Sequence, residues 1–478
     1  MSTSLPAEAL HDSLRRLSIA NLAFLARFPG ASSARQAIHT VYGGAHLFKA
    51  DTARRLGELA RRSLADYAPD AVSFARAVGL PGAEGLPADQ AAARFAHTIY
   101  ARVSEKLARE PVEDFRIDFE DGYGIRLDAE EDGHAAAAGH EVARGLAEGS
   151  LPPFLGIRIK PLNEEMRARS LRTLDVFLTA LRDRARGAWP GHFVITLPKV
   201  TIREQVETLA DALDALESAL GRAPGTLKLE LMVETPQSIF APGGGAALPG
   251  LVEAARGRCV AAHFGTYDYT AGLDVTAAYQ HMTHPACDFA KQVMQVTLAG
   301  TGVQLSDGAT NILPVAPHRV AADRPALTEA QHAENRRVMH AAWRLHYGHV
   351  RHSLETAYYQ GWDLHPAQLP TRYAAVYAFF LEALDPAAER LRNFVARAAQ
   401  ATLIGEVFDD AATGQGLLNY FVRAINCGAL TEAEAIERTG LAVEDLRGRS
   451  FLRILERRGR AAGATGPGHG PEARRQLS

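Results

Sequence analysis

Short apolar runs alternate with long amphipathic segments along most of this 478-residue chain, and this alternation constrains the fold more than any other feature. The segments between the runs repeat apolar residues near i, i+3, i+4 and i+7, which is typical of helices packed on a core. The predicted strands span residues 37–42, 115–119, 154–159, 193–197, 227–233, 259–264, 301–305 and 357–362. Eight strands alternating with helices predict a parallel α/β fold, the (β/α)8 TIM barrel.

An open, doubly wound sheet is the alternative arrangement of the same elements. Sheets of that kind often carry a GxGxxG phosphate loop after the first strand, whereas residues 42–46 read YGGAH here. The barrel is therefore favoured. The expected organisation is a helical lead-in at 1–36, a barrel at 37–370 with an insertion near 50–112, a C-terminal helical region at 371–458 and a disordered tail at 459–478.

Composition excludes several classes of partner. The formal net charge is -3 and no block of Lys or Arg is found, so we expect no nucleic acid. No apolar run approaches the roughly 18 residues of a membrane span, so we expect no membrane partner. The three cysteines lie far apart without CxxC spacing, which fits a reducing compartment. The sequence thus predicts a cytoplasmic protein that acts on a small molecule.

Polar residues follow the predicted strands, at the end of a barrel where active sites collect. Glu234 and Asp268 follow adjacent strands, and two such carboxylates can hold a hard cation that keeps several waters, as Mg2+ prefers. The remaining positions on the cation suit a 2-oxo acid, whose enolate charge the cation stabilises. Arg158 offers a planar fork for a substrate carboxylate. This combination predicts aldol or Claisen chemistry.

Six short motifs lie in a consistent order across the chain. They are IDFEDG at 117–122, GIRI at 156–159, LPKV at 197–200, VETP at 233–236, FGTYDYTAG at 264–272 and LHPAQ at 364–368. By these motifs the chain resembles the HpcH/HpaI aldolase and citrate lyase beta-subunit superfamily, which neighbours the malate synthases. The insertion PGGGAALP at 242–249 and the long C-terminal part depart from the common pattern, so the resemblance implies a divergent, enlarged subfamily.

The resemblance assigns roles to residues at the predicted mouth of the barrel, the end at which the strands have their carboxyl ends. It implies Glu234 and Asp268 as ligands of Mg2+ or Mn2+, and Arg158 as a catalytic residue that binds the substrate carboxylate. It implies Glu120 and Asp121 as an acidic pair that lines the metal site, through waters. The alternative for Arg158 is a structural ion pair inside the barrel, and for Asp268 it is a helix cap.

Further candidates have weaker support. Lys199, Gly265 and Thr266 are predicted to contact substrate, although Lys199 could instead neutralise the acidic cluster. His46, after the first strand, is a candidate general base or a hydrogen-bonded loop histidine. Asp409 ends the segment GEVFD, which resembles the family's G-x-M-[IV]-D, and this implies an acid/base role that often reaches a neighbouring subunit's site.

The leading hypothesis is a metal-dependent carbon–carbon lyase or aldolase. Its substrate would be a small 2-oxo acid or carboxylate, with acyl-CoA thioesters as a further candidate, and its intermediate a metal-stabilised enolate. One alternative is a phosphotransferase or hydrolase directed at phosphoenolpyruvate or a thioester on the same barrel. Another is a barrel that binds a metabolite without catalysis. Because members of the family commonly assemble, a homo-oligomer is expected.

Overall fold

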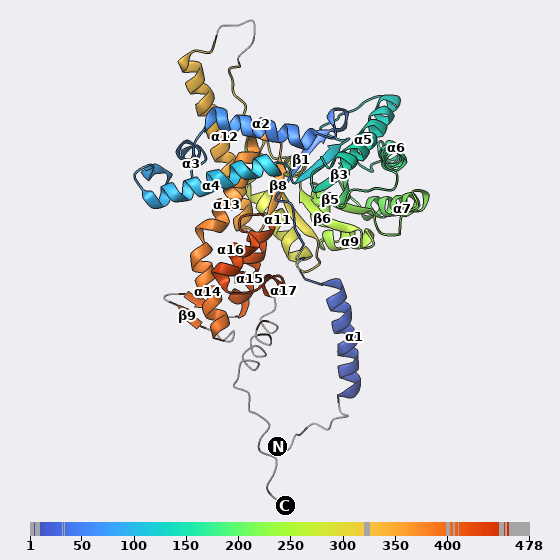
Figure 1. The fold of residues 1–478 in the computed structure, drawn as a ribbon. Coiled ribbons are helices and arrows are strands. Elements are labelled where there is room, and N and C mark those ends of the chain that lie inside the picture. The colour runs from blue at the N-terminus through green and yellow to red at the C-terminus, as the bar shows by residue number, and fades with distance from the viewer. Residues whose placement is uncertain are drawn as a thin grey trace, which may run out of the picture. The chain divides into compact units, whose positions relative to one another are not determined.

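The computed structural model describes residues 4, 10–30, 32, 34–319, 326–397, 402–404, 407–409, 411–448, 454 and 457. Eight parallel strands close into a barrel in which each strand pairs with the next in sequence and β8 pairs with β1 (Figure 1). The (β/α)8 prediction is confirmed. The strands are β1 His39–Gly44, β2 Asp114–Asp118, β3 Phe154–Arg158, β4 Phe193–Leu197, β5 Lys228–Val233, β6 Cys259–Phe264, β7 Gln304–Ala309 and β8 Gln360–Asp363.

Helices follow each strand and cover the barrel. Between β1 and β2 the chain forms three helices, so the predicted insertion is helical. The helices of this part are α2 Thr52–Tyr67, α3 Ala71–Val78, α4 Gln90–Arg109, α5 Asp128–Glu148, α6 Arg167–Ala185, α7 Arg203–Ala219, α8 Pro236–Ile239, α9 Leu248–Ala254, α10 Thr266–Gly272, α11 Pro285–Leu298, α12 Glu329–Glu355 and α13 Leu369–Glu382. Their buried faces are rich in Ala and Leu, as the 3.6-residue period predicts.

The seventh strand begins later than its apolar run predicts. The prediction was 301–305, whereas β7 spans Gln304–Ala309. Gly300 and Gly302 adopt φ angles of 76° and 83°, so the chain turns there before it can extend. Strand β7 therefore continues to Ala309 through residues SDGA that a pattern of apolar residues does not mark as a strand.

The interior of the barrel carries charge. Arg116 of β2 donates from Nη2 to Glu230 Oε2 of β5 at 2.7 Å and also contacts Asp114. His263 of β6 places Nε2 3.3 Å from the same Glu230 oxygen. Barrel interiors are usually layers of branched apolar side chains, so this ionic layer is an unusual floor for the mouth. Removing one member of such a buried pair typically costs about 3–5 kcal/mol, which ties β2 to β5.

The chain divides into two compact units. Unit 1 comprises residues 1–32 and 36–376, and unit 2 comprises 33–35 and 377–478. Unit 2 contains α14 Leu384–Ala396, α15 Ala411–Asn426, α16 Glu432–Thr439, α17 Val443–Gly448 and an antiparallel pair of strands, β9 Thr402–Ile404 and β10 Val407–Asp409. The predicted tail at 459–478 lies outside the described residues.

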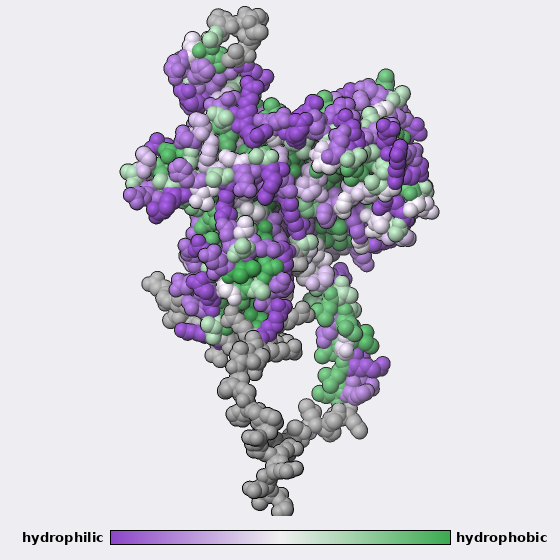
Figure 2. All heavy atoms as spheres, viewed as in Figure 1, coloured by the Kyte–Doolittle hydropathy of each residue, from purple (hydrophilic) through white to green (hydrophobic). Residues whose placement is uncertain are grey.

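Helix α1 (His11–Arg27) in the predicted lead-in exposes an apolar surface. None of its residues is buried, and Leu14, Leu22 and Phe24 are among its exposed apolar side chains (Figure 2). Exposed apolar surfaces of this kind often mark contacts between proteins. The homo-oligomer expected from the sequence stays a prediction. Across the described residues, no helix is both long and apolar enough to cross a membrane.

Candidate active site

The carboxyl ends of β2 and β3 bring Asp118 and Arg158 together in the barrel mouth. The two residues are register partners on adjacent strands. Arg158 donates from Nε to Asp118 Oδ1 at 2.7 Å and from Nη2 to Asp118 Oδ2 at 2.6 Å, and both side chains are buried. The fork predicted to hold a substrate carboxylate is therefore filled by Asp118. The remaining nitrogen, Nη1, lies 3.1 Å from Glu120 Oε2 and 3.7 Å from Asp121 Oδ2, so all three nitrogens face carboxylates of the protein.

Two aromatic rings support the same guanidinium. Arg158 Cζ lies 4.7 Å from the centroid of the Tyr42 ring and 5.8 Å from that of Trp362. The two rings lie 4.4 Å apart, on paired strands β1 and β8. Stacking on aromatic faces is a favourable environment for a guanidinium, and here it restricts the guanidinium's orientation.

Asp118, Tyr42 and Trp362 had no role in the sequence prediction. Alternation along β2 would have placed Asp118 inward, because it lies two residues after the inward-facing Arg116. Tyr42 and Trp362 lie 320 residues apart and meet because the barrel closes between the first and last strands. No local motif signals that contact.

Lys199 follows β4 and gathers three acidic side chains. Its φ of 50° lies in the left-handed region, which non-glycine residues adopt rarely and which is frequent at functional sites. Its Nζ contacts Glu120 Oε1 and lies 3.0 Å from Asp121 Oδ1 and 3.8 Å from Asp268 Oδ1. These contacts agree with the neutralising alternative for Lys199. The predicted role in substrate binding stays a prediction.

Glu234 follows β5 as a buried carboxylate beside a second one. It is 2% exposed, and the backbone N–H of Lys199 donates to its Oε1 at 2.7 Å. Burial, followed by repulsion from Asp268, raises the pKa of Glu234 to about 8. Burial also raises the pKa of Asp268, which lies in the first turn of α10. The charge of Asp268 therefore makes the ionised form of Glu234 less favourable, and a shared cation would relieve that repulsion.

The donor set fits a hard divalent cation. Glu234 and Asp268 offer carboxylate oxygens, the kind of ligand that Mg2+ and Mn2+ prefer. Within the described ranges, no group of three or more His, Cys, Asp or Glu side chains is arranged to hold a metal ion. Glu234 and Asp268 stay the predicted pair of ligands, while Glu120 and Asp121 are engaged by Lys199 and Arg158. A two-ligand site leaves room for substrate and water.

Gly265 is required by the close approach of Glu234. A Cβ at Gly265 would fall 2.5 Å from both Cβ and Oε2 of Glu234. We expect Gly265→Ala to displace the carboxylate and to weaken Mn2+ binding by about tenfold or more, measured by calorimetric titration. The matched control is Gly243→Ala, in the connection between β5 and β6, where a Cβ meets nothing within 4 Å. Equal Mn2+ affinity in the two variants would count against Glu234 as a ligand.

Thr266 and His46 lie at the ends of β6 and β1. Thr266 is buried, and its hydroxyl finds no hydrogen-bond partner in the described part of the chain. His46 lies in the turn Ala45–Leu47, with its ring centroid 5.6 Å from Tyr123. Burial, then the charge of Arg126, lowers the pKa of His46, which keeps the imidazole neutral near pH 7. A neutral ring can accept a proton, as a general base must.

Asp409 is placed differently from the other candidates. It is the last residue of β10 in unit 2, and its side chain lies outside the part of the chain that can be described. The acid/base role implied for it stays a prediction.

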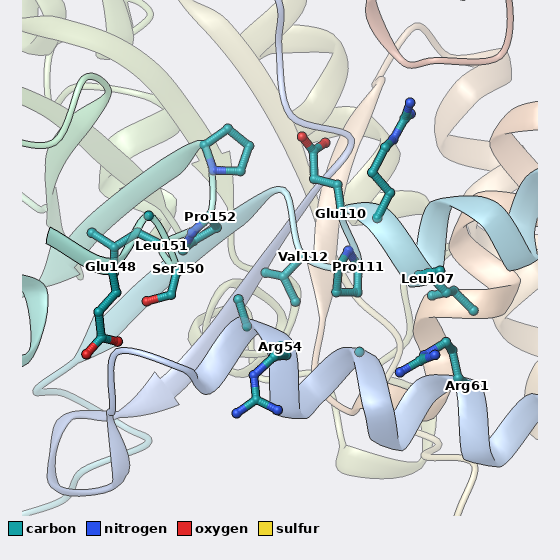
Figure 3. A pocket seen from close by; sticks show the side chains of 16 residues that line it. Arg54, Arg61, Leu107, Glu110, Pro111, Val112, Glu148, Ser150, Leu151 and Pro152 are labelled. Carbon is teal, nitrogen blue, oxygen red and sulfur yellow. The ribbon is translucent and has the colours of Figure 1, made fainter. Parts of the chain in front are cut away.

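A cavity of about 490 Å³ lies at the other end of the barrel (Figure 3). It is lined by Pro111 and Val112, which precede β2, and by Leu151 and Pro152, which precede β3. In TIM barrels the N-terminal face of the strands serves stability, whereas chemistry occurs at the opposite face. The candidate active site is therefore placed at the carboxyl ends of the strands, and not at this cavity.

Several solved structures are similar to this chain. A citrate lyase from Burkholderia xenovorans LB400 superposes with a TM-score of 0.50 at 19% identity, covering 71% of this chain and 92% of the other. CitE from Mycobacterium tuberculosis, in complex with magnesium, acetoacetate and coenzyme A, gives a TM-score of 0.42 at 15% identity, covering 69% and 95%. A Haloferax volcanii malate synthase gives 0.43 at 14% identity, covering 90% and 98%.

The first of these likenesses supports the predicted resemblance at the level of fold. A search of curated proteins finds no significant match. A family model described as a domain of unknown function, DUF6986, matches residues 17–454, and the chain therefore belongs to this family.

Proposed function

We propose that this protein is a divalent-metal-dependent carbon–carbon lyase that acts on a small 2-oxo acid or carboxylate through an enolate. The observation that carries the proposal is that Lys199 contacts both Glu234 and Asp268, beside the fixed guanidinium of Arg158 at the carboxyl end of the barrel. A further part of the proposal is that the chain is a divergent, enlarged relative of the citrate lyase beta-subunit superfamily. The fold shared with a citrate lyase supports this part.

Each side chain of the mouth has a defined task in this proposal. A bound Mg2+ or Mn2+ would act as a Lewis acid that stabilises the negative charge of an enolate oxygen. Arg158 binds the substrate carboxylate through Nη1, where the substrate takes the place of Glu120, because Asp118 holds the other two nitrogens. Tyr42 and Trp362 keep that guanidinium from rotating. The guanidinium is thereby held in place before the substrate binds, which lowers the entropic part of the activation barrier.

Proton transfer is assigned to His46 and Asp409. His46 is the proposed base that removes a proton from the carbon next to the carbonyl, since its lowered pKa keeps it unprotonated. Asp409 is proposed as a second acid/base group. Gly265 leaves the space that Glu234 occupies, and Thr266 begins the short helix α10 that carries Asp268.

The test is enolisation, which every form of this chemistry requires. With Mg2+ or Mn2+ present in deuterium oxide, we expect solvent deuterium to enter the methyl group of pyruvate, followed by proton NMR. Chelation of the metal should stop the exchange, and returning the metal should restore it. A set of small 2-oxo acids and carboxylates that shows no exchange with saturating metal would contradict the proposal.

A further inference from the structure

Lys199 forms ion pairs with carboxylates that lie where a cation at the mouth would bind. Its ammonium group contacts Glu120, Asp121 and Asp268, which come from the loops after β2 and β6. The side chain is 31% exposed, so the solvent side of the mouth is open to its movement. A single positive charge thus bridges two of the three strand ends, those of β2, β5 and β6, that supply the acidic residues of this cluster.

The backbone of the same residue serves the third acidic end. The N–H of Lys199 donates to Glu234 Oε1 at 2.7 Å, which leaves Oε2, the oxygen that lies against Gly265, for another partner. The left-handed φ of 50° is the conformation in which this N–H contacts Glu234 while Nζ reaches Asp268. Backbone strain held at one residue of a site is a sign that the site requires that conformation.

The ammonium and a divalent cation cannot hold the same oxygens together. Asp268 is engaged by Lys199 at 3.8 Å, and it is also half of the proposed ligand pair. Two positive charges within one such cluster would repel each other strongly at the low dielectric of a partly buried site. Binding of the cation therefore requires the ammonium to leave Asp268.

We propose that Lys199 is an internal counter-ion that a divalent metal displaces, and that the displaced ammonium then binds the anionic substrate. The inference rests on the proposed function and adds an order of binding to it, with metal first and substrate second. The reason for the order is charge. Until the metal binds, three carboxylates hold Lys199, so its ammonium is not free to attract an anion.

The first test measures Mn2+ affinity by calorimetric titration at one fixed pH, with no substrate present. Lys199→Met keeps most of the length of the side chain and an unbranched residue at this left-handed position, but it lacks the charge. Mn2+ should therefore bind about tenfold more tightly or better. Lys199→Arg keeps a charge and adds a bidentate fork, so Mn2+ should bind no more tightly than in the native protein. Lys228→Met, at the opposite end of β5, is the matched control and should leave the affinity unchanged.

The second test measures oxalate, an anionic mimic of the enolate. The native protein should bind oxalate only after Mn2+ is added, and Lys199→Met loaded with Mn2+ should bind it about tenfold more weakly. Oxalate binding to the chelator-treated native protein with undiminished affinity would overturn the order. Equal Mn2+ affinity in the native protein and Lys199→Met would overturn the displacement.

The outcomes separate this inference from the function on which it rests. If neither the native protein nor any variant binds Mn2+, the proposed metal site itself is wrong. If Mn2+ binds and supports enolisation but Lys199→Met changes neither the Mn2+ affinity nor the oxalate affinity, the lyase proposal stands. The proposed displacement of Lys199 is then wrong.

Discussion

Glu234→Gln is expected to abolish the metal-dependent exchange of pyruvate protons and, at the same time, to stabilise the protein stripped of metal. The amide cannot supply the anionic oxygen of the ligand pair, so exchange should fall by about a thousandfold or more. Its Oε1 can still accept the N–H of Lys199, so the local structure is kept. Opposite effects on activity and stability are typical of residues whose function conflicts with folding.

The stabilisation has a defined pH dependence. The pKa of Glu234 is about 8, against 4.5 as its ordinary value. Between these values the folded protein retains a proton that the unfolded chain has released, so stability falls as the pH rises from about 4.5 to about 8. Glu234→Gln lacks this slope. The variant should match the native protein near pH 4 and exceed its free energy of unfolding at pH 8 by roughly 4 kcal/mol at most.

Denaturant unfolding of chelator-treated protein at several pH values measures this difference. Glu253→Gln is the control, because Glu253 is an exposed residue of α9 that pairs with Arg203 at 3.6 Å and 68% exposure. Its stability should stay close to that of the native protein at every pH. A Glu234→Gln protein that is less stable than the native one at pH 8, or that retains metal-dependent exchange, would contradict the ligand role.

Arg158→Lys is expected to raise the KM for the 2-oxo acid and to destabilise the protein. One ammonium cannot replace two nitrogens on Asp118 and a third that faces Glu120 and is proposed to bind substrate. Because Asp118 is buried, loss of its bidentate partner should cost about 3 kcal/mol of stability, and kcat/KM should fall by about a hundredfold. Exchange kinetics and thermal unfolding measure the two effects.

A surface pair supplies the control for Arg158. Arg172 also meets a single carboxylate, that of Asp132, with two nitrogens, but its side chain is 62% exposed. Arg172→Lys should therefore leave both stability and kcat/KM nearly unchanged. Native KM in Arg158→Lys would show that the guanidinium does not bind substrate and that its pairing with Asp118 is structural only.

The barrel could be predicted because its signal is local and repeated. Each buried strand is a short apolar run, and each helix is a separate 3.6-residue period, so eight weak signals support one topology. The exceptions are β7 and β8, where polar residues extend or shift the strands. Asp363 of β8, for example, follows the apolar run in the sequence and is nevertheless buried. It is stabilised there because His346 of α12 and Arg372 of α13 pair with it.

The candidate site could be predicted only as a set of strand ends. The rule that chemistry follows the carboxyl ends of barrel strands selects Arg158, Lys199, Glu234 and Asp268. It does not predict which other residues these groups contact in the folded protein. That Asp118 fills the fork of Arg158, and that Lys199 bridges three carboxylates, depends on the stagger of neighbouring strands, and no single motif encodes it.

The central claim is that Glu234 and Asp268 share one cation within reach of Arg158. A crystal of the full chain soaked with Mn2+ and oxalate tests it directly, because anomalous scattering locates the manganese. We expect a single Mn2+ bound by both carboxylates, with oxalate joining it to Nη1 of Arg158. Manganese bound elsewhere, or carboxyl groups of these two residues directed away from each other around the soaked ions, would contradict the account.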